Sequence, residues 1–107
     1  MAELSGEELL RMAYILMHPT RFKIIQALKE AGRPLYIREI ADKIGENHRI
    51  VSFHLTILAE HGFVEGEYRV IEEPKERSKA RGKAGKFYRL TPKVDEILKK
   101  IVEIARL

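Results

Sequence analysis

The stretch IREIADKIGENHRIVSFHLTILAEHG, residues 37–62, decides the fold. Apolar residues recur at helical spacing up to Gly45, which ends a first helix. Asn47 can cap a second helix, and we expect that helix to cover residues 47–61 before Gly62 closes it. Because so short a turn joins the two helices, the stretch predicts a helix-turn-helix.

Two further helices are expected on the N-terminal side of this motif. Ser5 and Glu8 form a capping-box pattern ahead of an apolar helix that ends before Pro19. The next helix is expected to begin near Thr20, whose hydroxyl can cap it, and to end at Gly32. Both helices carry enough apolar residues to pack against the motif or against a second subunit.

On the C-terminal side the periodicity changes from helical to alternating. The segments at residues 63–73 and 86–90 predict a β-hairpin with a long loop, and residues 34–35 predict a short extended link. Thr91 and Pro92 then occupy the first positions of a last helix. The expected fold is mainly α with a small β-hairpin, in the order of a winged helix-turn-helix, with residues 47–61 as recognition helix.

Length and composition predict a single domain covering residues 1–107, with 45% hydrophobic and 34% charged residues. The absence of cysteine excludes disulfides, thiolate metal sites and thiol redox switches. Neither a membrane span nor a signal peptide is visible, so a cytoplasmic location is expected. The single Asn and single Gln beside 36 charged residues are typical of proteins from very hot environments.

Positive charge is concentrated in one segment, residues 74–89, which carries seven basic side chains against Glu76 alone, a net charge of +6. The other 91 residues carry 13 basic and 15 acidic side chains, a net charge of −2. This asymmetry predicts a polyanionic partner, and beside a helix-turn-helix it indicates double-stranded DNA contacted by the wing. The wing residues expected to contact DNA are Lys75, Arg77, Lys79, Arg81, Lys83 and Lys86.

The recognition helix has an outward face opposite its core residues Val51, Leu55 and Leu58. Arg49 on that face is the best candidate for a bidentate contact to guanine, and Phe53 could lie against a thymine methyl group. Packing of Phe53 on the first helix or on a subunit interface is the alternative. The predicted DNA-contacting residues of this helix are His48, Arg49, Ser52, Phe53 and Thr56.

Catalysis and metal binding have little support in the sequence. No P-loop, dinucleotide-binding turn, metalloprotease helix or catalytic Ser/His/Asp order is present, so the protein is not expected to be an enzyme. His54 and His61 share one helical face but lie two turns apart, too far to share an ion without further ligands. No cofactor, no resident metal and no small-molecule effector is therefore predicted.

In two sequence motifs the chain resembles the ArsR family of dimeric winged-helix transcriptional repressors. HPTRFKIIQAL (residues 18–28) is similar to the family's acid-Pro-x-Arg-x-x-Ile-Leu motif, although His18 replaces the acid. VSFHLTILAEHGFVE (residues 51–65) is similar to its Val-Ser-x-His-Leu-x-x-Leu-x-x-x-Gly-Leu-Val segment, which includes His54. The resemblance implies a homodimer that binds an imperfect palindrome with one recognition helix in each half-site.

The resemblance also implies that the first and last helices form the dimer interface. Both helices carry more apolar surface than a monomer of this size easily buries. The interface residues expected are Leu9, Met12, Ile15, Leu16, Ile97, Leu98, Ile101, Val102 and Ile104.

The chain departs from the metal-sensing members of the family. Those members place a Cys-x-Cys pair where this chain has LYIREIAD, or Asp and His ligands on the last helix, where this chain has Asp95 and Glu96 but no His. Neither sensing site is carried over. Three other functions stay open at this stage: a winged-helix module that binds an acidic protein, a chromatin-like protein that binds DNA without sequence preference, and an effector sensor that uses His and carboxylates at the dimer interface.

Overall fold

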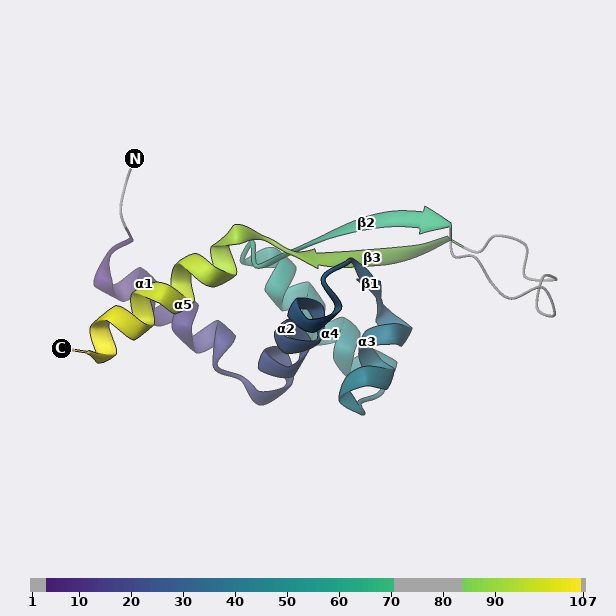
Figure 1. Ribbon diagram of the computed structural model, residues 1–107, viewed down its shortest axis with the longest axis horizontal. Coiled ribbons are helices and arrows are strands. Elements are labelled where there is room, and N and C mark those ends of the chain that lie inside the picture. The colour runs from purple at the N-terminus through teal and green to yellow at the C-terminus, as the bar shows by residue number, and fades with distance from the viewer. Residues whose placement is uncertain (1–3, 71–83, 107) are drawn as a thin grey trace, which may run out of the picture.

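The computed structural model of the protein describes residues 4–70 and 84–106 and has the architecture predicted from the sequence, a mainly helical winged helix-turn-helix (Figure 1). Helices α2, α3 and α4 pack together beneath a small sheet, and α1 and α5 lie beside each other at one end. The elements, in chain order, are α1 (Gly6–Leu16), α2 (Pro19–Ala31), β1 (Leu35–Tyr36), α3 (Ile37–Ile44), α4 (His48–Glu60), β2 (Val64–Val70), β3 (Ala84–Leu90) and α5 (Pro92–Ala105).

Local capping determines where the helices begin. Ser5 and Glu8 form the predicted capping box at α1, with the Ser5 hydroxyl accepting from the Glu8 amide and the Glu8 carboxylate accepting from the Ser5 amide. The side chains of Asn47 and Thr91 cap α4 and α5 as expected. These contacts satisfy amides that have no partner within the helix.

The prediction that Thr20 caps α2 is wrong. The helix begins at Pro19, and His18 is its N-cap, with Nδ1 accepting from the Thr20 amide at 3.1 Å. Pro19 suits the first helical position because its fixed φ is helical and that position needs no amide donor. The cap therefore moves two residues toward the N-terminus.

The turn of the helix-turn-helix spans only a few residues between α3 and α4. Gly45 ends α3 with φ 75°, a left-handed conformation that glycine adopts without steric cost, and its amide donates to the Ala41 carbonyl. Asn47 then accepts from the Ile50 amide at 2.9 Å and starts α4. This geometry fixes the direction of α4 relative to α3.

The sheet has the antiparallel strand order β1-β3-β2. The extended link predicted at residues 34–35 is seen as strand β1, which pairs Leu35 with Tyr88 and Tyr36 with Phe87. Strand β2 begins at Val64, one residue later than predicted, because the Phe63 amide donates to the Leu58 carbonyl at the end of α4. The hairpin projects beyond the helices at the end of the molecule opposite α1 and α5 (Figure 1).

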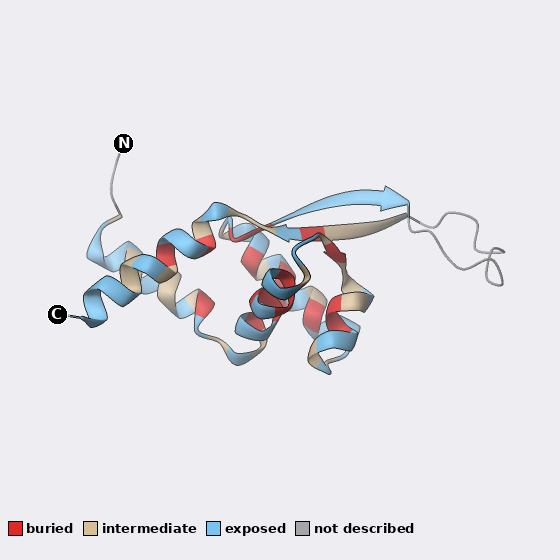
Figure 2. Cartoon of the chain, in the orientation of Figure 1, coloured by how far each residue is buried: buried red, intermediate tan, exposed pale blue. Residues whose placement is uncertain are grey.

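The core lies between α2, α3, α4 and the base of the sheet (Figure 2). Helices α1 and α5 contribute little to it and expose most of their length. Every helix within residues 4–70 and 84–106 is too short or too polar to cross a bilayer. The fully buried side chains are Leu16, Ile24, Leu35, Ile40, Val51, Leu55, Leu58, Phe63, Val64, Val94 and Ile97.

Candidate nucleic-acid interface

Helix α4 has the two faces predicted from its sequence. Val51, Leu55 and Leu58 are inaccessible to solvent and hold the helix against the core. Within residues 4–70 and 84–106, the opposite face is mostly open to solvent. On that face Ser52 is half-buried, and the exposed residues are His48, Arg49, Phe53 and Thr56.

The N-terminal end of α4 is electrostatically suited to an anion. Asn47 caps it, its first turn contains no acidic residue, and His48 and Arg49 are exposed there. The helix dipole adds partial positive charge at the same end. A phosphate or the acceptor edge of a guanine would therefore be attracted to this turn.

A hydrogen bond within α4 affects whether the Thr56 hydroxyl can contact a base or a phosphate. Its hydroxyl donates to the Ser52 carbonyl at 3.0 Å, so its single proton is used within the helix. The remaining lone pairs can accept from a base amino group, whereas a phosphate would require the hydroxyl to give up its helical bond. Thr56 is better suited to a base than to the DNA backbone.

Phe53 is 61% exposed, which rules out the alternative that it packs on α1 within one chain. Its ring meets the His54 ring edge-on, with the ring centres 5.1 Å apart. The alternative that Phe53 packs against a second subunit is not tested. An exposed aromatic on the outer face of α4 is available for apolar contact with a partner.

Beneath this face lies a buried polar contact that the sequence did not predict. The Arg21 side chain of α2 donates from Nε to Nδ1 of His54 at 3.1 Å, and from Nη1 to the Ile15 carbonyl of α1 at 2.9 Å. The ring of His18 lies 4.4 Å from that of His54, centre to centre. The only signal in the sequence is an arginine within the apolar pattern of α2.

The tip of the wing lies outside the described residues. That includes the predicted DNA-contacting residues Lys75, Arg77, Lys79, Arg81 and Lys83. Lys86 is described: it lies in β3 opposite Tyr68 of β2.

Lys86 extends across the outer hairpin between two aromatic rings. Its ammonium lies 5.4 Å from the centre of the Tyr68 ring and 5.7 Å from that of Tyr88. A Cβ atom on Gly66 would come within 2.6 Å of Lys86 Cε, so the path of Lys86 depends on glycine at that position. Sequence reasoning missed exposed Tyr68, although the alternation of β2 places it on the same face as buried Val64.

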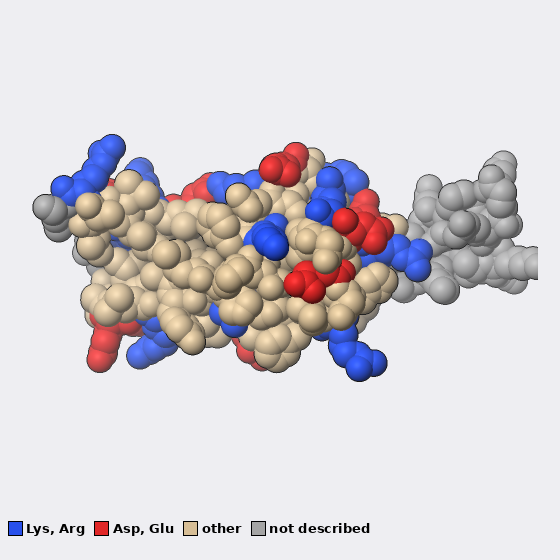
Figure 3. Space-filling view, turned by 90° about the horizontal axis from the view of Figure 1, so that it is seen from below, with Lys and Arg blue, Asp and Glu red and all other residues tan. Residues whose placement is uncertain are grey.

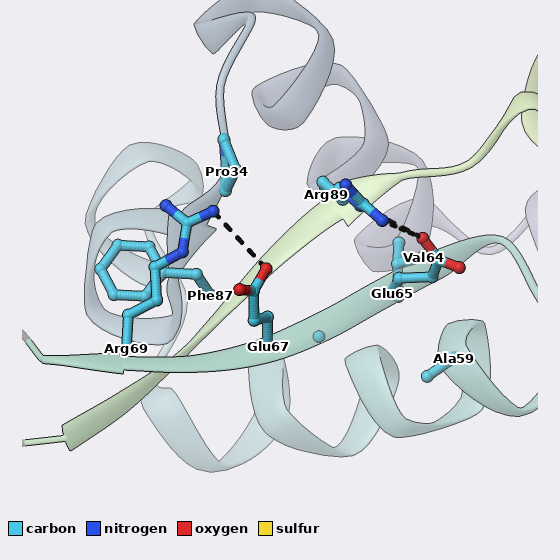
Figure 4. A pocket seen from close by; sticks show the side chains of 9 residues that line it. Pro34, Ala59, Val64, Glu65, Glu67, Arg69, Phe87 and Arg89 are labelled. Carbon is cyan, nitrogen blue, oxygen red and sulfur yellow. Dashed lines mark hydrogen bonds and ion pairs between the residues drawn. The ribbon is translucent and has the colours of Figure 1, made fainter.

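The other face of the hairpin carries ion pairs (Figure 4). Arg89 contacts Glu65 at 2.7 Å and Arg69 contacts Glu67 at 3.6 Å, while Arg69 also lies over the Phe87 ring. These residues line a hollow of about 510 Å³ beside Pro34 and Ala59. Because the cations are matched by carboxylates, this hollow has little net attraction for an anion.

The surface seen in Figure 3 has a broad uncharged area with Lys, Arg, Asp and Glu scattered around it. This agrees with the near-neutral charge of the chain outside residues 74–89. Within the described residues, the first turn of α4 stands out because its exposed basic side chains have no acidic residue beside them in that turn.

The C-terminal end of α4 is joined to the start of α5. The Lys93 ammonium donates to the His61 carbonyl at 2.7 Å, and its charge lies over the Phe63 ring. The Thr91 hydroxyl donates to the Gly62 carbonyl at 2.6 Å. A change in the position of α5 would therefore shift the residues at the C-terminal end of α4.

The predicted dimer residues divide into two groups. Leu16 and Ile97 are 1% and 0% exposed within one chain and hold α1 and α5 to the rest of the fold, so their assignment to a subunit interface stays a prediction. Leu9, Met12, Ile15, Leu98 and Ile101 are partly buried, and Val102 and Ile104 are exposed.

Helix α1 exposes apolar residues that were not predicted as interface residues, namely Leu10, Tyr14 and Met17. Leu10 also lines a small apolar hollow of about 150 Å³ between α1 and α5. The spacing of these residues along α1 could have identified them, since they recur at i, i+4 and i+7.

The histidines do not form a metal site in the part of the chain that the structure describes, where no group of three or more His, Asp or Glu side chains could hold an ion. His18 caps α2 and His54 accepts from Arg21. The His61 ring bonds the Ile57 carbonyl at 2.9 Å. Three of the four histidines therefore have structural partners.

The chain is similar to a helix-turn-helix family and to solved structures of transcriptional regulators. A family model described as a helix-turn-helix domain matches residues 16–67. The structure is similar to the transcriptional repressor BigR from Xylella fastidiosa, with 26% identity, a TM-score of 0.65, and coverage of 92% of this chain and 84% of that one. No curated protein sequence matches the chain.

Two further solved structures show the same fold. The homodimeric winged helix-turn-helix domain of a possible ArsR-family regulator from Mycobacterium bovis has 21% identity and a TM-score of 0.60, covering 99% of this chain and 90% of that one. Diamide-treated YodB from B. subtilis has 18% identity and a TM-score of 0.66, covering 98% and 92%.

Proposed function

We propose that the chain is an ArsR-type winged helix-turn-helix transcriptional regulator, which acts as a homodimeric repressor and reads a palindromic DNA site. In this proposal α4 of each protomer enters a major groove and the basic wing contacts the backbone or the minor groove. Regulators of this kind are not enzymes, and the proposal assigns the protein no catalytic step.

The observation that carries the proposal is the exposed outer face of α4. A helix of 13 residues is about 20 Å long, and the major groove of B-DNA is wide enough to receive it. Arg49 at its capped N-terminal end is suited to the acceptor atoms of guanine. Phe53 farther along is suited to a thymine methyl group.

Exposed apolar residues on α1 and α5 support the homodimer. Leu10 and Tyr14 of α1 are more than two-thirds exposed, and Val102 and Ile104 of α5 are about half exposed. A second copy of the same pair of helices would cover both sets through a two-fold axis. The recognition helices would then reach successive major grooves, about 34 Å apart.

The wing supplies contacts that hold the protein on DNA without reading its sequence. Lys86, between the rings of Tyr68 and Tyr88, would continue this cationic surface toward the body of the protein. If the dimer neutralises about eight phosphates, log affinity against log salt should have a slope of roughly −7.

The test is selection of bound genomic fragments, followed by titration of the enriched sequence at two salt concentrations. The proposal expects a palindromic site bound at least about 1,000-fold more tightly than unrelated DNA. Equal affinity for all fragments would contradict it and favour the chromatin-like alternative.

A paired substitution separates DNA reading from a protein-binding role. Changing both Arg49 and Ser52 to Ala should weaken binding to the selected site by about 100-fold, because a bidentate base contact and a neighbouring hydroxyl are lost. The control is Lys23→Ala, an exposed cation of α2, which should leave the affinity unchanged within about two-fold. Unchanged affinity in the double variant would favour the protein-interaction module.

A further inference from the structure

A single buried side chain connects the helix that carries the proposed dimer surface to the helix that carries the proposed DNA surface. Arg21 of α2 is 9% exposed and donates to the Ile15 carbonyl in the last turn of α1 and to the His54 ring in the middle of α4. His54 itself is 6% exposed and adjoins Phe53. Displacement of Arg21 would remove this polar link between α1 and α4, two helices that also pack against each other directly.

The Arg21–His54 hydrogen bond requires one protonation state of the histidine. A guanidinium has donors but no acceptor and stays charged at all physiological pH values. Nδ1 of His54 must therefore carry a lone pair, with the ring proton on Nε2. Protonation of the ring would place an N–H at Nδ1 facing the N–H of Arg21, and the bond would be replaced by repulsion between two cations.

The groups around His54 oppose its protonation. Burial lowers the pKa of His54, and electrostatic interactions with His18 and Arg21, both at the N-terminal end of α2, lower it further. Glu46, in the turn before α4, acts weakly in the other direction. Phe53 contributes only the edge of its ring. The Arg21–His54 hydrogen bond is therefore intact at neutral pH and breaks only under acid conditions, when His54 is protonated.

We propose that Arg21 and His54 form a proton-controlled link that positions the recognition helix relative to α1, so that acidification which protonates His54 releases the protein from DNA. Arg21 and His54 are positioning residues in this mechanism and do not touch DNA themselves. The inference rests on the proposed function, because it assigns a form of regulation to the same interface.

The direction of the pKa shift sets the sign of the effect. Because the pKa of His54 is lowered in the folded protein, the stability that its neutral ring contributes is complete above the unfolded value of about 6.5 and is lost as pH falls through the folded value. Acidification should therefore weaken binding to DNA.

The experiment measures the dissociation constant for the selected DNA site at pH 7.5 and pH 5.5 at constant ionic strength. The wild-type protein should lose at least about ten-fold in affinity at the lower pH. His54→Gln replaces the ring nitrogen by an amide oxygen that can accept from Arg21 and does not titrate. This variant should bind within about three-fold of wild type at pH 7.5 and change by less than about two-fold at pH 5.5.

Two control variants identify the responsible group. His18→Asn keeps an acceptor at the N-cap of α2, and His48→Gln removes the titratable group from the outer face; both should retain the acid-induced loss. If the loss persists in His54→Gln, or disappears only in His18→Asn, the proposal is overturned.

A second measurement works without DNA and without a variant. Nuclear magnetic resonance of the wild-type protein should show the Arg21 Nε–H signal and the His54 ring signals changing with one common midpoint. Independent midpoints would overturn the link. If no DNA site is bound at pH 7.5, the proposed function has failed, whereas the common titration still tests the link on its own.

Discussion

The unit formed by α2, α3 and α4 and the pair formed by α1 and α5 differ in how completely they are buried. In the first, residues such as Ile24, Ile40 and Leu55 are inaccessible to solvent within one chain. In the second, Leu10 and Tyr14 are 73% and 77% exposed, and much of the apolar surface of both helices remains in contact with water. The helix-turn-helix is complete in a single chain, and the terminal helices are not.

This difference follows from where the apolar residues point. The helices of the first unit each direct one apolar stripe toward a shared centre and the base of the sheet. Helices α1 and α5 pack against each other and, through Leu16 and Ile97, against the core. Within residues 4–70 and 84–106, apolar side chains on their other faces stay exposed, namely Leu10, Tyr14, Val102 and Ile104. The comparison predicts that the same type of substitution will have different consequences in the two regions.

The largest expected effect comes from the buried face of α4. Leu55→Ala should lower the free energy of unfolding by about 3 kcal/mol, because it removes a fully buried side chain and leaves a cavity. Chemical denaturation measures this change. Phe53→Ala on the outer face is the control and should change stability by less than about 0.5 kcal/mol. Equal losses in the two variants would contradict the two-sided description of α4.

The next effect concerns assembly rather than folding. Tyr14→Asp places a charge in the exposed apolar face of α1 and should shift the protein from dimer to monomer in sedimentation. Affinity for a palindromic site should fall by about 100-fold, because a monomer binds only one half-site and loses the gain in affinity from binding both at once. Phe22→Asp, a matched change on exposed Phe22 of α2, should leave the dimer intact. Dissociation in both variants would place the interface elsewhere.

A smaller effect is expected where the two regions meet. The Thr91 hydroxyl caps α5 and bonds the Gly62 carbonyl just after α4. Thr91→Ala should cost about 1 kcal/mol of stability through the lost cap. Thr91→Ser keeps the hydroxyl and should recover most of that loss, as measured by thermal unfolding. An equal loss in both variants would mean that the methyl group, not the hydroxyl, is responsible.

The smallest effect is expected for the surface ion pair between the two regions. Lys29 and Asp95 join α2 to α5 at 2.6 Å, and their side chains are 46% and 73% exposed. Asp95→Asn should therefore change stability by no more than about 0.5 kcal/mol, and the difference should vanish in high salt. A loss that survives high salt would show that this contact is stronger than its exposure implies.

Features set by neighbouring residues could be predicted from the sequence. The capping box at Ser5, the caps at Asn47 and Thr91 and the helix end at Gly45 each depend on a few adjacent side chains, and all were confirmed. The error at Thr20 was also local, because His18 and Thr20 can both cap a helix and only the backbone at Pro19 decides between them.

Features set by distant residues could not be predicted in the same way. Arg21 and His54 lie 33 positions apart, and nothing in either segment alone indicates that they meet. The inward position of Leu16 and Ile97 depends on how α1 and α5 lie against the rest of the fold. The DNA contacts assigned to the outer face of α4 and to the wing, and the hot environment indicated by the composition, stay predictions.

Gly66 of β2 and Lys86 of β3 are in steric contact, so we expect the residues at these two positions to depend on each other. Gly66 leaves room for the stem of Lys86, and a Cβ atom there would displace it. In a library randomised at both positions, we expect a larger residue at 66 to survive together with a short residue at 86. Positions 66 and 86 should therefore vary as a pair. The coupling is steric, because Gly66 has no side chain that could form an ion pair or a hydrogen bond with Lys86.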